Sequence, residues 1–341
     1  MAPMALPPIE AAGLRITDWC PARCRHCYVS SGPDGRAWMS VAQAEGHLAA
    51  LKRLGVPGGA VHVTGGEPFG DFQRLLEIVR AARRAGLDGI AYVETSGSWA
   101  ESGAVARQRL EALAAAGMHQ VAISADPYHQ EFIPPDRVRR LLEAAREVLG
   151  EGGIRARRWR WLQAPQDVGP MEEPQRRALF RTFLARYPER MTGRAAGELA
   201  PLADRVPLEA IAARPCREPL LAARHVHVDP DGWVYPGTCA GIVLGRATRR
   251  NPLDEVLGGW HSEAGTAAAL LAEGGPRRLA AEAARQGFAP DAQGYAGPCH
   301  LCWAVRAWLV GAGTGGTDLG PAAMYRRGRR PRPGCPGGHP S

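Results

Sequence analysis

An α/β fold with a parallel sheet is predicted by the pattern and the composition of this 341-residue sequence. Over residues 1–165, short apolar or β-branched runs alternate with longer stretches of helical periodicity. Repeated strand–helix units of this length are typical of parallel sheets. The composition, 45% hydrophobic and 22% charged, excludes a disordered chain, a collagen or a coiled coil. Whether the sheet is open or closes into a full or partial barrel, functional groups are expected where strands end.

The strands and helices of this first part follow one another in order. The first strand is expected at residues 14–19 and leads into a loop with three cysteines. Ser40 suits the N-cap of a helix that ends near Leu54, because Gly55 and Pro57 follow. The other expected strands are residues 60–64, 89–94, 119–124 and 154–162, and the other expected helices are residues 71–85, 101–116 and 135–149.

The second half of the sequence has a different organisation. Residues 225–235 predict two short strands joined by an Asp-Pro-Asp-Gly turn. A helix is expected near residues 277–286, and a Cys-x-x-Cys at 299–302 precedes an apolar helical segment. From residue 311 the chain is rich in Gly, Pro and Arg, so we expect a flexible tail in which Cys335 binds no metal.

The formal net charge of +8 does not by itself indicate a nucleic-acid partner. Without five tail arginines it falls to +3, which is ordinary for a protein of this size. These are Arg326, Arg327, Arg329, Arg330 and Arg332. No apolar run approaches the roughly 20 residues of a membrane span, and we recognise no secretion signal. A cytoplasmic protein without membrane contact is therefore expected.

The eight cysteines are the most informative residues. Because disulfides are disfavoured in a reducing cytosol, metal ligation is their expected use. Cys20, Cys24 and Cys27 offer three thiolates within eight residues. A [4Fe–4S] cluster has four corners, so three cysteines leave one iron open to a ligand from outside the protein. A zinc site with His26 as the fourth ligand is the alternative that these residues leave open.

A second motif follows the cysteine loop, which we define as residues 19–28 (WCPARCRHCY). The expected second strand ends in the sequence Thr-Gly-Gly-Glu-Pro at residues 64–68. Together the two motifs resemble the signature of radical S-adenosylmethionine (SAM) enzymes, over about residues 12–195. The resemblance implies a partial (β/α)6 TIM-like barrel. It also implies that SAM binds the open iron through its amino and carboxylate groups, and that one electron cleaves it to methionine and a 5′-deoxyadenosyl radical.

The same resemblance implies residues that bind the cofactor. Those in or next to the motifs are His26, Tyr28, Gly65, Gly66, Glu67 and Pro68. The glycines allow backbone to approach a ligand closely, and the glutamate carboxylate is suited to an ammonium group. Ser124, at the end of the fourth expected strand, is a candidate for the methionine carboxylate. Asp126 is a candidate for the ribose or the substrate, although Asp-Pro also opens ordinary turns.

Further candidates come from the residue pattern alone. Arg158 and Arg160 alternate along the fifth expected strand and would share one face, where either could bind a carboxylate. A solvated strand edge packed by tryptophan is the other interpretation. Glu94, Asp126 and His129 lie at strand ends and are the catalytic candidates, but no general base can be assigned among them.

Four later cysteines form a second group: Cys216, Cys239, Cys299 and Cys302. Their spacing around the expected hairpin resembles the twitch region, a shortened SPASM domain, and implies one auxiliary [4Fe–4S] cluster. A zinc ion bound by four cysteines is the alternative. The expected division is therefore a radical SAM barrel over residues 1–195, a hairpin-and-helix auxiliary cluster domain over 196–310, and the tail over 311–341.

The sequence favours one function and leaves two alternatives open. The favoured function is oxidation or cross-linking of a ribosomal peptide, with a possible separate peptide-recognition protein as partner. The second is dehydrogenation or rearrangement of a small molecule such as a sugar or aminocyclitol. The third, from another class, is a non-catalytic iron–sulfur or zinc scaffold. Either enzyme implies an electron donor such as flavodoxin or ferredoxin.

Overall fold

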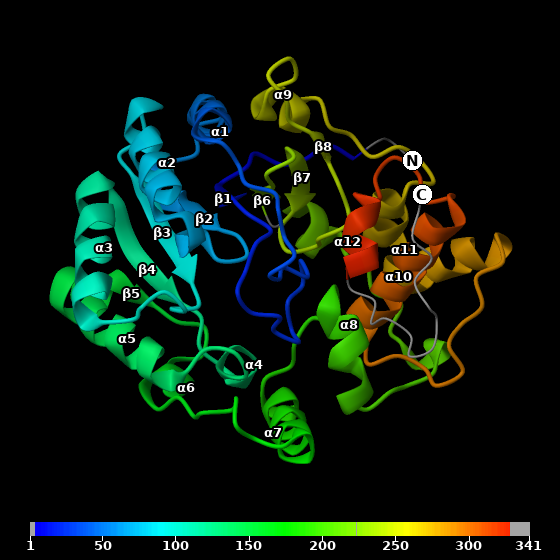
Figure 1. The fold of residues 1–341 in the computed structure, drawn as a ribbon. Coiled ribbons are helices and arrows are strands. Elements are labelled where there is room, and N and C mark those ends of the chain that lie inside the picture. Colours follow the sequence, from blue (N-terminus) through cyan, green and yellow to red (C-terminus); the bar gives the residue numbers. More distant parts are fainter. Residues whose placement is uncertain (1–3, 223, 328–341) are drawn as a thin grey trace, which may run out of the picture.

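One sheet of eight strands organises the molecule, which is described here from a computed structural model over residues 4–222 and 224–327 (Figure 1). The strand order is β5-β4-β3-β2-β1-β6-β7-β8. Strands β1 to β5 pair in parallel, and β6 pairs in parallel with the other side of β1. The strands are β1 Ala11–Arg15, β2 Val61–Thr64, β3 Ile90–Thr95, β4 Met118–Ile123, β5 Ile154–Arg155, β6 His225–Val228, β7 Trp233–Pro236 and β8 Gly245–Arg246. The open α/β sheet confirms the predicted partial barrel.

The helices that follow the first strands cover the outer face of the sheet (Figure 1). They are α1 Val41–Arg53, α2 Phe72–Arg84, α3 Gly103–Ala116 and α5 Pro135–Leu149. Ser40 caps α1 as predicted, because its hydroxyl accepts a hydrogen bond from the Gln43 N–H while the Gln43 side chain accepts from the Ser40 N–H. The apolar faces of these helices and of the strands form the main core, with Leu14, Val63 and Val93 fully buried.

Shorter helices and a second core complete the fold. The remaining helices are α4 Pro127–Gln130, α6 Trp159–Gln163, α7 Glu173–Arg186, α8 Arg194–Glu198, α9 Leu253–Gly258, α10 Ala267–Arg285, α11 Pro298–Ala312 and α12 Ala322–Arg327. The second core lies around α10 and α11, on the side of the molecule away from α1–α5 (Figure 1). The predicted helix at 277–286 is the second half of α10, which is interrupted at Gly275.

The predicted hairpin forms, and it adds strands β6 and β7 to the same eight-stranded sheet. Strands β6 and β7 are antiparallel and are joined by the turn at residues 229–232. Asp229 in this turn accepts hydrogen bonds from the backbone N–H groups of Asp231 and Trp233 and pairs with Arg15 of β1 at 3.0 Å. The hairpin is thereby fixed to β1. The proposed boundary near residue 195 remains a prediction.

The predicted fifth strand is wrong over most of its length. Only Ile154–Arg155 pair with β4, and the chain then turns into α6, which Arg158 precedes as N-cap. The alternation of arginine with apolar residues resembles a strand, but Leu162 is fully buried from a helical turn instead. Arg158 and Arg160 therefore do not share a strand face.

The expectation of a flexible tail from residue 311 is also wrong for its first part. Helix α12 packs beside α11, with Met324 4% and Tyr325 3% exposed. The Tyr325 hydroxyl donates a hydrogen bond to the Gly241 carbonyl and its ring stacks on Trp303. Arg329, Arg330, Arg332 and Cys335 lie outside the described residues. Among the described helices, none has the length and apolarity needed to cross a membrane.

Candidate active site

A cavity of about 590 Å³ opens on the inner side of the sheet, where the parallel strands end. It brings together most of the residues that the sequence predicted for a site: Cys20, Cys24, His26, Cys27, Tyr28, Gly65, Gly66, Glu94, Ser124, Asp126, His129 and Arg158. Another cavity, of about 440 Å³ between β8, α9 and α10, is lined by none of them. Glu67, Pro68 and Arg160 do not line the 590 Å³ cavity, and Arg160 is exposed.

The two glycines after β2 allow the cysteine loop to lie directly on the end of that strand. The Gly66 N–H donates to the Thr17 carbonyl at 2.8 Å, and the Glu67 N–H donates to the Trp19 carbonyl at 2.7 Å. A Cβ at Gly66 would collide with the Trp19 carbonyl oxygen. The close approach that the glycines permit is therefore to the cysteine loop itself, which they position at the cavity.

Glu67 lies behind the cysteine loop and forms hydrogen bonds to the end of β3. Its carboxylate is 1% exposed and accepts hydrogen bonds from the Thr95 hydroxyl at 2.8 Å, the Ser96 N–H at 2.9 Å and the Ser96 hydroxyl at 2.5 Å. Burial raises the pKa of Glu67, and these donors oppose the shift. The carboxylate thus ties the end of β2 to the end of β3 and is already occupied by protein donors.

The three cysteines of the loop share one cavity. Cys20 and Cys24 are 8% and 6% exposed, Cys27 is half-buried, and all three line the cavity. Burial raises the pKa of the Cys20 thiol to about 12 and that of Cys24 well above its usual value. Metal binding deprotonates such thiols, and the proton release couples metal affinity to pH.

Arg194 holds the cysteine loop, and sequence reasoning missed it. Its guanidinium is buried and donates to the Cys24 carbonyl at 2.9 Å and to the Ser31 carbonyl at 2.6 Å, while its N–H donates to the Cys27 carbonyl at 3.0 Å. A buried arginine more than 160 residues away from its partners leaves no local pattern. The side chain also places a positive charge next to the thiols, where it opposes the rise in their pKa.

Replacing Arg194 with methionine is expected to loosen the cysteine loop. Two buried carbonyl groups would lose their donor, at a cost of about 1–3 kcal/mol each, and iron bound per chain should fall. Iron content after anaerobic reconstitution and the urea midpoint measure the two effects. Arg23→Met is the matched control, because Arg23 lies in the same loop but is half exposed and pairs with Asp34. Equal iron content in the two variants would contradict this role.

A second group of site residues surrounds Asp126 at the start of α4. One carboxylate oxygen accepts hydrogen bonds from the N–H groups of Tyr128 and His129, both at 3.0 Å. The same oxygen lies 3.0 Å from His129 Nδ1, and the other lies 3.7 Å from His26 Nε2. Although burial alone lowers the pKa of His129, the Asp126 carboxylate raises it overall. The aspartate thus places a negative charge beside both imidazole rings at the cavity.

The remaining candidates occupy the strand ends in different ways. Ser124 follows β4, and its N–H donates to the Thr95 carbonyl. Glu94 accepts a hydrogen bond from the Thr64 hydroxyl at 2.6 Å, and burial raises its pKa. Arg158 pairs with Glu189 at 3.0 Å, a partner that lies 31 residues away and has no local sequence signal.

The four later cysteines also converge, between the hairpin and α11. Cys216 precedes the hairpin, Cys239 follows β7, and Cys299 and Cys302 lie near the start of α11. Burial and the proximity of the three other thiols raise the pKa of Cys216 to about 12. The nearly fully buried Arg306 places its positive charge beside Cys302 and Cys239.

Residues 14–155, which include the cysteine loop and strands β2 to β5, match the family model of the Radical SAM superfamily. The match implies a [4Fe–4S] cluster and SAM, and the three cavity cysteines fit that requirement. No curated protein matches the chain.

Three solved structures are similar at low identity. BtrN in complex with AdoMet and 2-DOIA is 14% identical, with a TM-score of 0.42 over 80% of this chain and 89% of that one. SuiB of Streptococcus suis, bound to precursor peptide SuiA, is 11% identical, with a TM-score of 0.39 over 76% and 66%. The structure of anSMEcpe with bound AdoMet and Cp18Cys peptide is 15% identical, with a TM-score of 0.35 over 66% and 73%.

Proposed function

We propose that the chain reductively cleaves SAM and removes a hydrogen atom from a compact polar molecule held in the 590 Å³ cavity. The observation that carries the proposal is that Cys20, Cys24 and Cys27 line the same cavity as titratable side chains of the strand ends. When bound, the cluster and SAM supply a 5′-deoxyadenosyl radical, and the protein binds, orients and shields the reactants.

The residues around the cysteine loop have distinct roles in this proposal. Cys20, Cys24 and Cys27 hold the cluster, and the backbone of Gly65 and Gly66 and the hydroxyl of Ser124 border the space for SAM. Glu67 and Pro68 act indirectly, by holding the strand end. The buried Asp126 orients His26 and His129 at the cavity wall.

The cavity walls favour a compact polar substrate. The same cavity of about 590 Å³ has to take the cluster, SAM and the substrate together, so a compact substrate fits it better than a bulky one. Here the inner wall carries Glu94, Arg158, Glu189 and several histidines. Such groups bind hydroxyl, amino or carboxylate groups. An alcohol of a sugar or aminocyclitol matches this chemistry, and its dehydrogenation removes one hydrogen atom, a proton and an electron.

A second candidate, oxidation or cross-linking of a ribosomal peptide, is favoured by the charge at the edge of the cavity. Arg155, Arg157 and Arg190 line it and are exposed, so an acidic peptide could lie across the opening with one side chain inside. A separate peptide-recognition protein would be the partner in that case. Either reaction requires a one-electron donor of the flavodoxin or ferredoxin class.

We also propose that Cys216, Cys239, Cys299 and Cys302 bind an auxiliary [4Fe–4S] cluster. Within the described residues, only two groups, both rich in histidine, bring three candidate ligand atoms within 4.8 Å of one another. A single zinc ion with Zn–S distances of about 2.3 Å would hold its sulfurs roughly 3.8 Å apart. No three of the four later thiols form such a group in the described residues, so they do not match the tight spacing that one zinc ion requires.

Isotope transfer distinguishes the substrate classes. The reconstituted, dithionite-reduced protein would be given SAM with deuterated sugars and aminocyclitols, or with deuterated acidic peptides. Deuterium in 5′-deoxyadenosine from the first set is the expected result, detected by mass spectrometry. Transfer from the peptides alone would establish the second candidate. Absence of 5′-deoxyadenosine in every mixture would reject both and favour the non-catalytic scaffold.

A further inference from the structure

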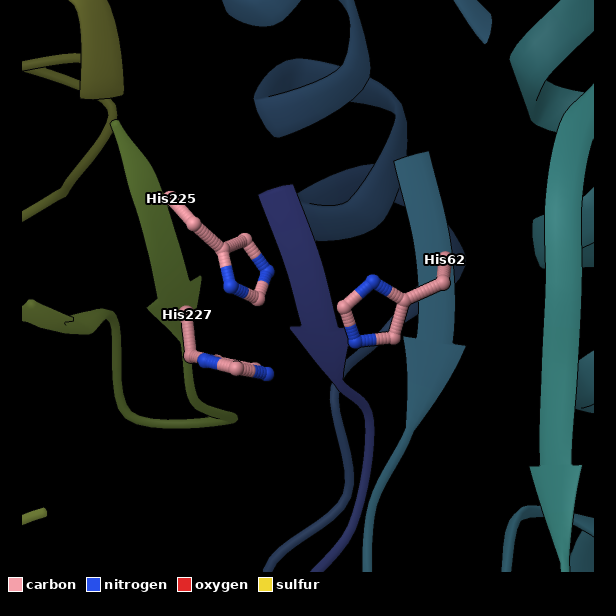
Figure 2. Close-up of side chains that lie close together, drawn as sticks. All are labelled: His62, His225 and His227. Atoms are coloured by element: carbon pink, nitrogen blue, oxygen red, sulfur yellow. The ribbon is translucent and has the colours of Figure 1, made fainter. Parts of the chain in front are cut away.

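Three histidines converge on the inner face of the sheet, in the wall of the 590 Å³ cavity (Figure 2). His62 lies on β2, His225 and His227 lie on β6, and β1 runs between these two strands. The register pairs Gly13 of β1 with His62 on one side and with His227 on the other. Because residues two apart on a strand face the same way, both histidines of β6 point to the side on which His62 lies.

The spacing of the three rings suits a shared ion. Their candidate ligand nitrogens lie within 4.8 Å of one another, and the ring centroids are 4.6–5.3 Å apart. Around zinc, with Zn–N distances of about 2.0–2.1 Å, tetrahedral nitrogens lie roughly 3.3 Å apart. Small rotations of the side chains are therefore enough to bring the nitrogens onto one ion.

Gly13 leaves the space between the rings free. A Cβ at this position would lie 2.6 Å from Nε2 of His227 and 2.6 Å from Nε2 of His62. The Cδ2–Nε2 edge of His227 and the Nε2 atom of His62 therefore border the place that a side chain at Gly13 would fill. The glycine is needed here for the rings, since its own backbone is ordinary extended strand.

The hydrogen bonds prepare these rings as ligands. His227 Nδ1 lies 2.7 Å from the Gly237 carbonyl, which can only accept, so Nδ1 carries the proton and Nε2 presents its lone pair. His225 Nε2 is buried and has no hydrogen-bond partner among the described residues, which is unfavourable unless a ligand is bound.

We propose that His62, His225 and His227 bind one divalent transition-metal ion, with zinc as the best match, and that its fourth position faces the cavity. The group contains no carboxylate, so Mg²⁺ and Ca²⁺, which prefer oxygen ligands, do not match it. Three imidazoles with an open fourth position are a ligand set of catalytic rather than structural zinc sites.

The ion would give the cavity a second binding function, separate from both cysteine groups. An open position at this wall accepts an oxygen or nitrogen atom of a substrate and polarises the group that carries it. The register places Tyr92 next to His62, and the two rings stack at 4.7 Å. The Tyr92 ring thus fixes the orientation of His62 from the side opposite to β1.

Zinc binding by the cluster-loaded, full-length protein tests the proposal without any assay of SAM cleavage. The protein is equilibrated with Zn²⁺, freed of loose metal by gel filtration, and measured by plasma mass spectrometry and zinc K-edge absorption. We expect one zinc per chain with a nitrogen-rich shell at about 2.0–2.1 Å. The metal proposal can fail while SAM cleavage persists, so its failure is distinguishable from failure of the proposed function.

Substitution of single histidines tests which side chains bind the zinc ion. His62→Gln and His227→Gln each remove a zinc ligand and are expected to weaken zinc binding at least about a hundredfold. Loss of a residue that only hydrogen-bonds to a ligand typically weakens metal binding by roughly 10–100-fold. His119→Gln is the control, since His119 is exposed on β4, and its affinity should equal that of the parent. The absorption edge is read on the parent, so it does not depend on how a variant folds. No bound zinc, a purely sulfur shell near 2.3 Å, or parent-like affinity in folded His62→Gln would overturn the proposal.

Discussion

Replacing Cys20, Cys24 and Cys27 together with alanine is expected to abolish formation of 5′-deoxyadenosine from SAM. The three thiols line one cavity, and three cysteine ligands would leave one iron of a [4Fe–4S] cluster open. Without them SAM has no iron to bind, and the rate should fall to that of the solution without protein. The assay is chromatographic detection of 5′-deoxyadenosine after anaerobic reconstitution and reduction with dithionite.

The matched control lacks the other four cysteines, Cys216, Cys239, Cys299 and Cys302. This control has four cysteine-to-alanine substitutions, against three in the test variant, and it should still cleave SAM. Far-UV circular dichroism checks that both variants fold. If the variant without Cys20, Cys24 and Cys27 makes as much 5′-deoxyadenosine as the parent, these cysteines do not hold the SAM-cleaving cluster.

The sequence predicted the fold well where the signals are local. The capping box of Ser40 and Gln43 lies within one helical turn, and α1 begins at the next residue. The β6–β7 hairpin is likewise defined by a short turn. The strand predicted at residues 154–162 is wrong because the alternation of arginine and apolar residues also fits a short helix, and that helix buries Leu162. Such a short segment is decided by its tertiary packing.

The candidate site shows the same division. The cysteine loop and the Gly-Gly-Glu-Pro segment are contiguous motifs, and the structure brings their backbones together. Motif matching did not reveal that the Glu67 carboxylate bonds to Thr95 and Ser96, since strand register decides that contact. The role of Arg194 was not predicted from the sequence for a related reason. Its partners are backbone carbonyls, which any sequence can provide.

The histidine group was missed although part of its signal was visible. His225 and His227 stand two apart in a strand pattern, which places them on one face. Their third member, His62, is brought beside them by the parallel pairing of β6 with β1 and of β1 with β2. The pairing of β6 with β1 joins segments more than 200 residues apart, and the sequence alone did not predict it.

Replacing Cys216, Cys239, Cys299 and Cys302 with alanine is expected to block product formation more strongly than SAM cleavage. The four thiols meet between the hairpin and α11, outside the residues that line the 590 Å³ cavity. A cluster with four cysteine ligands has no open iron for a substrate, so its role here would be to accept the electron left on a substrate radical. The ratio of 5′-deoxyadenosine to product, measured by mass spectrometry, should therefore rise.

Metal content tests the same assignment independently of the substrate. Two four-iron clusters predict about eight irons in the parent, about four in the variant without Cys20, Cys24 and Cys27, and about four in the variant without the later cysteines. Because the histidine group is a separate candidate for zinc, zinc content alone does not decide the matter. The zinc absorption edge does, since sulfur ligands lie at about 2.3 Å and nitrogen ligands at about 2.0–2.1 Å. About four irons in the anaerobic parent, together with one sulfur-ligated zinc that is lost when the four later cysteines are replaced, would assign these cysteines to a structural zinc site.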